Sequence, residues 1–482
     1  MSIINMLPEK GVVAIVGLQW GDEGKGKIVD LFAQWADMVA RGTGGANAGH
    51  TILVGNKSHV FHLVPSAILR DVDGVTNVIG QGVAFDPAIM LDELAELDRL
   101  QVSYRNLRIS RNAHLVLPQH LILDQLRELK SGNAKIGTTG KGIGPTYADH
   151  VGRIGLRVVD LLNLDAFRAK LIHNLESKWD ELQASPDLVK QVMQANSRLS
   201  PFWDDRELIS VEVILSVYIA FGQRLRPFIA DTESLVSQAV ADGKRVLLEG
   251  AQASLLSIDH GIYPMVTSSD STIAGLANGV GLLGSQIDKV YGIVKTPAMS
   301  RVGSGVFPTE LGPAEDGMFP DADINSRDED EQCVAIRRVG KEFGSTTGRP
   351  RRIGWLDLPL LRHALRSGGN ELILTKVDMM DECAEIKICI HYIYRGADYD
   401  LGDQVLRSGD EVSVAFGDDA LMQNMEPVFV TFPGWQQNLT DMKASGQLPA
   451  KLLRIIRFIE EKVDRRVVVV SVGPDREQTI VL

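Results

Sequence analysis

Cysteine, a targeting segment and long apolar runs are scarce or missing in this sequence of 482 residues. The only cysteines, Cys333, Cys383 and Cys389, are odd in number and form no CxxC pair, which excludes a disulfide framework and a cysteine zinc site. The first residues lack a basic stretch followed by an apolar core, and no run approaches the roughly 18 apolar residues of a membrane span. We therefore expect a soluble, cytoplasmic protein with reduced thiols and no membrane partner.

Basic charge is also in short supply. Lys and Arg number 50 against 62 Asp and Glu, for a net charge of −12. This balance argues against a protein that coats nucleic acid, although it permits a local basic pocket for phosphates. The hydrophobic fraction of 44% and the charged fraction of 23% are typical of a globular enzyme. Because no internal repeat or clear linker is visible, we predict a single domain over residues 1–482.

Apolar runs alternate with helical spacings along the chain. We expect strands at 12–18, 246–248, 372–374 and 467–470, helices near 28–35, 359–367 and 452–459, and a mostly helical segment at about 160–235. This alternation predicts an α/β fold, with a single large domain around a mostly parallel central sheet and with helical and loop insertions. Residues 313–331 contain eight acidic side chains and one arginine, and we interpret them as a solvated surface insertion.

A glycine-rich loop lies between the first predicted strand and helix, with the sequence Gly21-Asp22-Glu23-Gly24-Lys25-Gly26-Lys27. Such a loop presents backbone N–H groups, a helix N-terminus and lysines to one anion. Its spacing fits the P-loop, but Ile28 stands where a hydroxyl would hold Mg²⁺. A carboxylate beside phosphates is unfavourable unless a cation or a proton transfer uses it. We therefore interpret Asp22 as a magnesium ligand, a base, or both.

Two further loops indicate nucleotide chemistry. His50 ends the sequence Asn47-Ala48-Gly49-His50, a loop of small residues in which an imidazole could donate to a phosphate or a leaving oxygen. The sequence Thr375-Lys376-Val377-Asp378 follows a predicted strand and resembles the base loop of GTP-binding proteins. An Asp carboxylate accepts from the N1–H and the amine of guanine together, and adenine offers no such pair of donors. The phosphate loop and this base loop predict a GTP site.

A second anionic ligand is indicated by two other segments. Residues 344–352 place three arginines within four positions beside hydroxyl groups, and arginine binds carboxylates and phosphates in a bidentate manner. Residues 137–145 form another loop of glycine, hydroxyl and lysine residues, suited to phosphate. The residues thus predict an enzyme that uses GTP on an anionic, phosphorylated substrate.

Taken together, the motifs of this chain resemble those of the adenylosuccinate synthetase family. The resemblance runs from Val12 to the C-terminus through ordered landmarks: Gln19 to Lys27, Asn47 to Thr51, Gly137 to Pro145, Glu249 to Gln252, Asp259 to Gly261, Thr347 to Arg349, Gly354 to Asp357 and Gly473 to Arg476. It implies that IMP, GTP and L-aspartate give adenylosuccinate, GDP and phosphate, with Mg²⁺.

The resemblance also implies catalytic roles. Asp22 would take the N1 proton of IMP, so that O6 attacks the γ-phosphate of GTP. His50 would stabilise the transferring phosphoryl group, and Gln252 would assist in catalysis. Mg²⁺ would be held by Asp22 and the carbonyl of Gly49. The aspartate amine then attacks C6 of the 6-phosphoryl intermediate.

Binding residues follow from the same resemblance. IMP would contact Asn47, Thr138, Thr139, Arg153, Gln252, Thr267 and Arg349. GTP would contact Gly21, Glu23, Gly24, Lys25, Gly26, Lys27, Gly49, Thr51, Lys376, Asp378, Ser471 and Gly473. L-aspartate would contact Ser345, Thr346, Thr347, Arg349 and Arg351. Arg153 would reach the IMP of a partner subunit, which implies a homodimer.

Two alternatives remain open from the sequence. One is a ligase of the same fold that acts on another purine nucleotide or deoxynucleotide; Asp22 speaks against a guanine substrate, because relatives that use one are expected to lack this aspartate. The other is a GTP-binding module without ligase activity. Such a module would not need Asp22 and His50, and it would not need the arginine loop at residues 344–352.

Overall fold

In the computed structural model, strand β1 (Gly11–Gly17) is covered on both faces. Val12 and Val16 belong to one core cluster, while Val13 and Ile15 belong to another on the opposite face. Successive side chains of a strand point to opposite faces, so a continuous apolar run marks a strand buried on both sides. The first predicted strand is therefore a central strand of the sheet.

The structure describes residues 3–54, 57–70, 74–132, 137–206, 208–312, 315–344 and 348–482. Within these ranges a ten-stranded sheet has the order β11-β7-β5-β2-β12-β1-β13-β16-β22-β23. Besides β1, its strands are β2 (Met38–Arg41), β5 (Thr76–Ile79), β7 (Leu107–Ser110), β11 (Ile229–Ala230), β12 (Arg245–Glu249), β13 (Lys289–Lys295), β16 (Glu371–Thr375), β22 (Arg466–Ser471) and β23 (Thr479–Val481). All neighbours are parallel except β22 and β23. The predicted mostly parallel sheet is confirmed.

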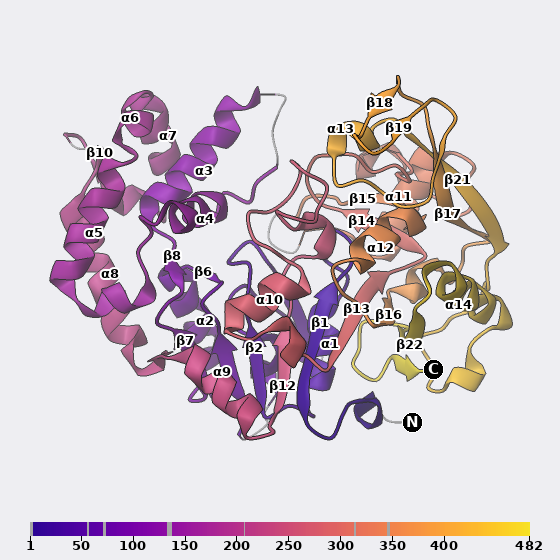
Figure 1. Cartoon of the computed structure of the whole chain (residues 1–482), viewed down its shortest axis with the longest axis horizontal. Helices are drawn as coiled ribbons and strands as arrows, with labels where there is room; N and C mark the ends of the chain where they lie inside the picture. The colour runs from indigo at the N-terminus through magenta and orange to yellow at the C-terminus, as the bar shows by residue number, and fades with distance from the viewer. Residues whose placement is uncertain are drawn as a thin grey trace.

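Helices flank this sheet in two groups (Figure 1). The helices are α1 (Lys25–Phe32), α2 (Pro87–Arg99), α3 (Pro118–Lys130), α4 (Ile143–Gly152), α5 (Leu164–Glu176), α6 (Trp179–Gln183), α7 (Pro186–Ala195), α8 (Val211–Leu225), α9 (Thr232–Ala241), α10 (Ile273–Val280), α11 (Glu329–Val339), α12 (Leu358–Leu365), α13 (Asp419–Met422) and α14 (Ala450–Val463). In Figure 1, α3 to α8 gather on one side of the sheet and α11 to α14 on the other. Helix α1 ends before Trp35, which nevertheless stays buried.

A second sheet, which the sequence did not predict, lies in the C-terminal half. It contains β14 (Ala298–Arg301), β15 (Arg352–Asp357), β17 (Glu385–Tyr394), β20 (Glu411–Val412) and β21 (Met425–Pro433), with antiparallel pairs except between β15 and β17. The smaller strand pairs are β3 (His50–Val54) with β4 (Lys57–Phe61), β6 (Ala84–Phe85) with β8 (His114–Leu115), β9 (Trp203–Asp204) with β10 (Leu208–Ile209), and β18 (Tyr399–Asp400) with β19 (Val405–Leu406). The second sheet matters for the site because β15 directly follows the arginine loop.

The acidic segment is anchored at its end. Ile324 is buried in the core, and the side chain of Asp328 accepts from the N–H of Asp330 at 3.0 Å to cap helix α11. Acidic residues occupy the first turn of that helix, where they favour the positive end of the helix dipole. The last acidic residues thus begin a helix, while Asp321 and Asp323 are exposed.

The central strands place polar residues along one edge of the sheet. Strands β12, β1, β13, β16 and β22 are mutually parallel neighbours, so their carboxyl ends meet there. These ends are Gly17, Glu249, Lys295, Thr375 and Ser471. Open α/β sheets bind ligands at this edge.

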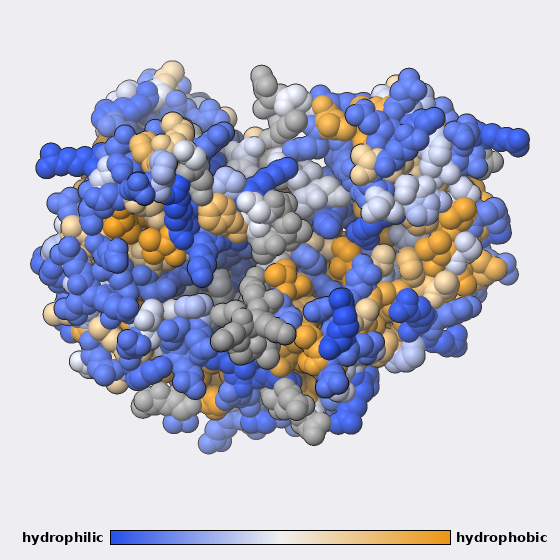
Figure 2. Space-filling view, turned by 180° about the vertical axis from the view of Figure 1, so that it is seen from behind, coloured by the Kyte–Doolittle hydropathy of each residue, from blue (hydrophilic) through white to orange (hydrophobic). Residues whose placement is uncertain are grey.

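The outer surface is mostly hydrophilic on the face in Figure 2, with orange patches of limited extent. Among the described residues, no helix combines the length and the apolar character that a membrane crossing requires. Cys333, Cys383 and Cys389 are free thiols, and all three are buried.

Candidate active site

The loop between β1 and α1 is held by its own side chains. Gly24 adopts a left-handed conformation with φ of 81°, which lets the chain turn into the first turn of α1. The buried carboxylate of Glu23 accepts from the N–H of Gly21 at 2.8 Å and of Gln19 at 3.2 Å. Lys25 Nζ donates to the same carboxylate at 2.7 Å. Glu23, predicted to contact GTP, therefore directs its side chain into its own loop.

Asp22 joins this loop to the arginine loop. Its backbone has φ of 59°, a conformation that costs a non-glycine residue free energy and is frequent at functional sites. Its Oδ2 lies 2.8 Å from Nη2 of Arg351, and the Asp22 side chain remains 29% exposed. Two residues that the sequence placed in the base role and in aspartate binding are thus in direct contact.

His50 forms a buried pair with Glu249. Nδ1 of His50 lies 2.5 Å from Oε1 of Glu249, and Ser66 donates to the same carboxylate from its Oγ at 2.6 Å and its N–H at 2.8 Å. Burial lowers the pKa of His50 below its ordinary value, so the imidazole is neutral near pH 7. A carboxylate can only accept, so Nδ1 carries the proton and Nε2 is left for a ligand.

Asn47, Gln252 and Thr267 form one hydrogen-bonded chain. Gln252 Nε2 donates to Oδ1 of Asn47 at 3.0 Å, and Asn47 Nδ2 donates to Oγ1 of Thr267 at 3.3 Å. Gln252 also has a left-handed backbone, with φ of 50°. Its Oε1 is buried without a hydrogen-bond partner in the described part of the chain, as expected of an atom placed to accept from a ligand. The residues predicted to contact the purine nucleotide are therefore neighbours.

The loop at 137–145 is tied to helices α3 and α4. Asp124 of α3 accepts from the N–H of Gly142 at 2.9 Å. Thr138 also donates a hydrogen bond to Asp124. Burial raises the pKa of the Asp124 carboxyl, and the hydrogen bonds from Gly142 and Thr138 oppose that rise. Thr138 and Thr139 both face the central cavity described below.

The predicted guanine loop lies beside the C-terminal segment. Lys376 has a left-handed backbone, with φ of 55°. Burial raises the pKa of the Asp378 carboxyl, while the charges of Lys27 and Lys376 oppose that rise. Lys27 Nζ donates to Ser471 Oγ at 2.8 Å and to the carbonyl of Gly473 at 2.7 Å.

Lys27, predicted to contact GTP, lines the cavity and also holds the C-terminal segment. Its ammonium also donates to the carbonyl of Gln478 at 3.0 Å, so that three acceptors of the C-terminal segment surround it. Burial lowers the pKa of Lys27 to about 8, against the opposing charges of Asp378 and Asp475. These contacts connect helix α1 to the C-terminal segment.

A single cavity of about 1150 Å³ brings these segments together. Its lining includes Gly21, Asp22, Gly24 to Lys27, Asn47, Gly49, His50, Thr138, Thr139, Gln252, Thr267, Arg351, Lys376, Asp378, Ser471 and Gly473. Most of the predicted site residues therefore face one space, although they come from segments spread over the whole chain.

Other predicted residues lie elsewhere. Arg153 is exposed at the C-terminal end of α4 with φ of 62°, and it does not line the cavity. Arg349 is also exposed and outside the lining. Ser345, Thr346 and Thr347 lie outside the described residues, as does the side chain of Thr51.

Sequence reasoning missed three buried charged residues behind the cavity. Glu249 ends β12 and Lys295 ends β13, and a charged residue at the carboxyl end of a central strand was the available signal. Glu342 is fully buried and contacts both Arg351 and Lys376. No local pattern marks Glu342, because its partners are distant in sequence.

Comparison with known proteins identifies the family of this chain. The family model for adenylosuccinate synthetase matches residues 14–480. The adenylosuccinate synthetase of Moorella thermoacetica is 42% identical over 472 residues, and that of Chlorobium chlorochromatii is 41% identical over 476 residues. Each alignment covers 98% of this chain and 98% of the relative.

Solved structures give the same result. The fully ligated adenylosuccinate synthetase of Plasmodium falciparum has a TM-score of 0.79 and 31% identity, and the match covers 98% of this chain and 100% of that one. The succinoaminodeoxyadenylate synthetase of cyanophage S-2L, bound to dGMP and dATP, has a TM-score of 0.53 and 18% identity over 98% of this chain and 95% of that one, and shares the fold. The chain belongs to the adenylosuccinate synthetase family and is a GTP-dependent ligase that joins aspartate to IMP.

Proposed function

We propose that the residues lining this cavity perform the ligation in two steps. In the first, O6 of IMP takes the γ-phosphoryl group of GTP and GDP leaves; in the second, the aspartate amine attacks C6 and phosphate leaves. The observation that supports this proposal is the common cavity, in which Asp22, His50 and Gln252 face the same space as the guanine loop. Positioning and electrostatic stabilisation supply most of the catalysis in such phosphoryl transfers.

Asp22 acts as the base in the first step. Removal of the N1 proton places negative charge on O6, which makes that oxygen a nucleophile. The partly exposed carboxylate can reach a ligand in the cavity once Arg351 exchanges it for another anion. A carboxylate of the aspartate substrate is such an anion, and arginine binds it in a bidentate manner.

His50 stabilises the phosphoryl group through Nε2. Phosphate oxygens near this nitrogen favour the protonated ring, and Glu249 stabilises the imidazolium through Nδ1. The protonated ring then donates to the transferring group, and later to the phosphate that leaves C6.

Mg²⁺ fits this cavity as well. The carboxylate of Asp22 and the backbone of Gly49 both line it, and oxygen atoms are the ligands that this ion prefers. The described residues hold no group of three or more His, Cys, Asp or Glu side chains able to bind a metal ion, so phosphates and water would complete the shell of Mg²⁺. Bound Mg²⁺ would neutralise charge on the GTP phosphates.

The substrates occupy three parts of the cavity. The carboxylate of Asp378 accepts from guanine, with Lys376, Ser471 and Gly473 beside it, and the phosphates follow the loop from Gly21 to Lys27. IMP lies against Asn47, Gln252 and Thr267, with its phosphate at Thr138 and Thr139. L-aspartate lies against Arg351, with Ser345 to Thr347 and Arg349 in the same loop.

The active unit is a homodimer that works in the cytoplasm. Arg153 is exposed and outside the cavity of its own chain, which suits a residue that reaches the IMP phosphate of a partner subunit. The buried free thiols of Cys333, Cys383 and Cys389 suit a reducing compartment.

A panel of nucleotides tests the substrate. The protein is incubated with GTP, Mg²⁺ and aspartate, and IMP, dIMP, GMP and dGMP are supplied in turn while GDP and the coupled product are followed. Turnover with IMP alone supports the proposal. Turnover only with another nucleotide indicates a ligase of different specificity, and nucleotide binding without aspartate-dependent turnover indicates a binding module.

A further inference from the structure

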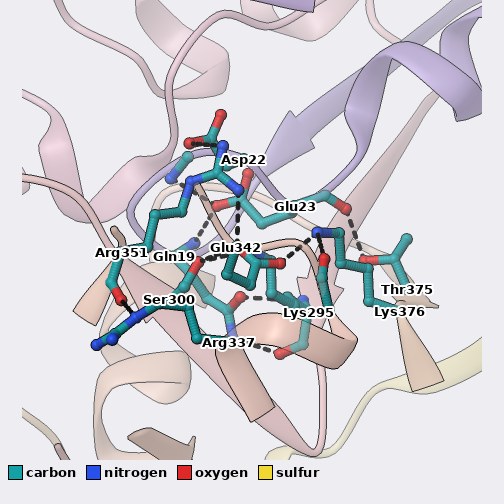
Figure 3. A network of polar contacts seen from close by, with 12 residues as sticks. Gln19, Asp22, Glu23, Lys295, Ser300, Arg337, Glu342, Arg351, Thr375 and Lys376 are labelled. Atoms are coloured by element: carbon teal, nitrogen blue, oxygen red, sulfur yellow. Dashed lines mark hydrogen bonds and ion pairs between the residues drawn. The ribbon is translucent and has the colours of Figure 1, made fainter. Parts of the chain in front are cut away.

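One buried carboxylate behind the cavity holds three cations from three segments (Figure 3). Oε2 of Glu342 accepts from Lys295 Nζ at 2.9 Å and from Arg351 Nη1 at 2.7 Å. Its Oε1 accepts from Lys376 Nζ. Ser300 Oγ donates to Oε2 at 3.0 Å. Oε2 thus accepts from three donors and Oε1 from one, and the Glu342 side chain has no exposed surface.

The charges of this network keep Glu342 ionised. Burial alone would raise the pKa of Glu342, but the charges of Lys295, Lys376 and Arg351 lower it well below its ordinary value. Burial lowers the pKa of Lys295 to about 8, although Glu342 opposes that change. A buried charge of this kind is stable only while its partners stay in place, because loss of one leaves uncompensated charge.

Each cation belongs to a different part of the site. Lys376 lies in the guanine loop after β16, and Lys295 ends β13 between β1 and β16. Arg351 ends the arginine loop and contacts Asp22 with the other end of its guanidinium group. Glu342 also stands two residues before that loop, and its carbonyl accepts from the N–H of Arg351 at 2.9 Å.

The network therefore connects two ligands that do not touch each other. Guanine at Asp378 lies next to Lys376, and the aspartate substrate pairs with Arg351 in place of Asp22. Both ligands would contact cations held by the same buried carboxylate, so a ligand that draws one cation changes the charge that the other cation shares with Glu342. Coupling of this kind is reciprocal and typically amounts to about 5- to 150-fold in affinity.

We infer that Glu342 is a positioning residue that couples the guanine subsite to the aspartate subsite. The inference rests on the proposed placement of GTP and aspartate. Glu342 contacts neither ligand, and it acts through Lys376 and Arg351. The IMP contacts at Asn47, Gln252 and Thr267 lie outside the network.

Glu342→Gln tests this inference, because glutamine keeps the size of the side chain and removes its charge. The affinity for GDP is measured by calorimetry at saturating IMP, with and without L-aspartate, a mixture that cannot react. In the wild-type protein, aspartate should tighten GDP binding at least about fivefold, and in the variant by less than about twofold. The KM values for GTP and aspartate should rise about tenfold, while that for IMP stays within about twofold.

Two further variants separate coupling from general loss of structure. Glu342→Asp keeps the charge and should recover part of the coupling. Asp160→Asn removes another buried carboxylate, which Lys170 contacts at 2.6 Å outside the cavity, and it should keep wild-type coupling.

Three results would overturn the inference. They are a wild-type protein without coupling, a folded Glu342→Gln variant with unchanged coupling, or a KM for IMP that rises as much as the other two. Because the calorimetry needs no turnover, a failure of the ligase assay would count against the proposed function and not against the coupling.

Discussion

His50 and Glu249 form a close pair behind the cavity, with 2.5 Å between Nδ1 of the imidazole and Oε1 of the carboxylate. The carboxylate fixes the ring and its tautomer, and Ser66 fixes the carboxylate through two donors. This arrangement is that of a base or acid oriented by a third group. Glu249 therefore orients the imidazole of His50, a role that its position at the end of a strand does not specify by itself.

Glu249→Gln should lower kcat about 10- to 100-fold with little change in the KM values, because His50 loses its fixed orientation and the charge that stabilises the imidazolium. Glu249 raises the proton affinity of His50, so the variant should also shift the alkaline limb of the kcat profile to lower pH. Steady-state assays across pH measure both effects. Glu93→Gln, which removes a buried carboxylate that accepts from the N–H of Val64, should keep the wild-type profile. An unshifted limb in Glu249→Gln would assign the carboxylate to packing alone.

Asp22→Asn should reduce turnover by at least about 10³-fold, since the amide cannot accept the N1 proton. The side chain keeps its size, so calorimetry with GDP should give an affinity within about threefold of wild type. The control is Asp37→Asn, at the opposite end of the strands, where the carboxylate contacts Arg245 at 2.6 Å. Near-normal turnover of Asp22→Asn would remove Asp22 from the base role.

Asp378→Asn should change the preferred base from guanine to xanthine. Asparagine offers one acceptor and a donor, which suits the O2 carbonyl of xanthine and leaves the amine of guanine without a partner. We expect kcat/KM for GTP to fall by about 10²-fold or more, with a smaller change for xanthosine triphosphate. Asp381→Asn, a carboxylate that instead accepts from Trp435 at 3.0 Å, should leave the ratio of the two values unchanged. A uniform loss with both nucleotides would argue against base recognition by Asp378.

Asp357→Asn should make the free energy of unfolding less sensitive to a rise in pH through the neutral range. Burial raises the pKa of Asp357 to about 7, against hydrogen bonds from Tyr392 and Leu360 that favour the charged form. Between about pH 4 and pH 7 the folded state therefore keeps a proton that the unfolded state releases, so the stability of the wild type falls as pH rises. From about pH 5 to pH 8 the variant should gain roughly 2–3 kcal/mol relative to wild type.

Urea unfolding at the two pH values measures this change. Asp418→Asn provides the control, because Asp418 is an exposed cap of α13 that accepts from Leu421 at 2.9 Å. Parallel pH dependence of Asp357→Asn and wild type would show that Asp357 does not titrate in this range.

Mixtures of two inactive variants should recover activity if the site is shared between subunits. Arg153→Leu removes the group given to the partner, and Asp22→Asn removes the base, so each homodimer lacks one function. A mixed dimer has one intact site, and free exchange of equal amounts should restore about one quarter of wild-type activity. Light scattering gives the oligomeric state in the same samples. A stable dimer without recovery would place the role of Arg153 within its own chain.

Several features of this protein follow from its sequence alone. The segment from Gly21 to Gly24 lies between a strand and a helix, and Lys25 to Lys27 form the first turn of that helix, because apolar neighbours and glycines dictate the local backbone. The residues predicted around Asn47, Gln252 and Asp378 face one cavity, because they follow strands that are parallel. Alternating strand and helix patterns were enough to give the mostly parallel sheet.

Only the tertiary structure decided which charged groups meet. Lys27 and Gly473 are separated by 446 positions, and the structure places the ammonium of Lys27 on the carbonyl of Gly473. Glu249 meets His50, and Glu342 meets Lys376, because strand order brings distant loops to one edge of the sheet. A local pattern specifies the conformation of its own segment, whereas the partner of a buried charge depends on which strands become neighbours.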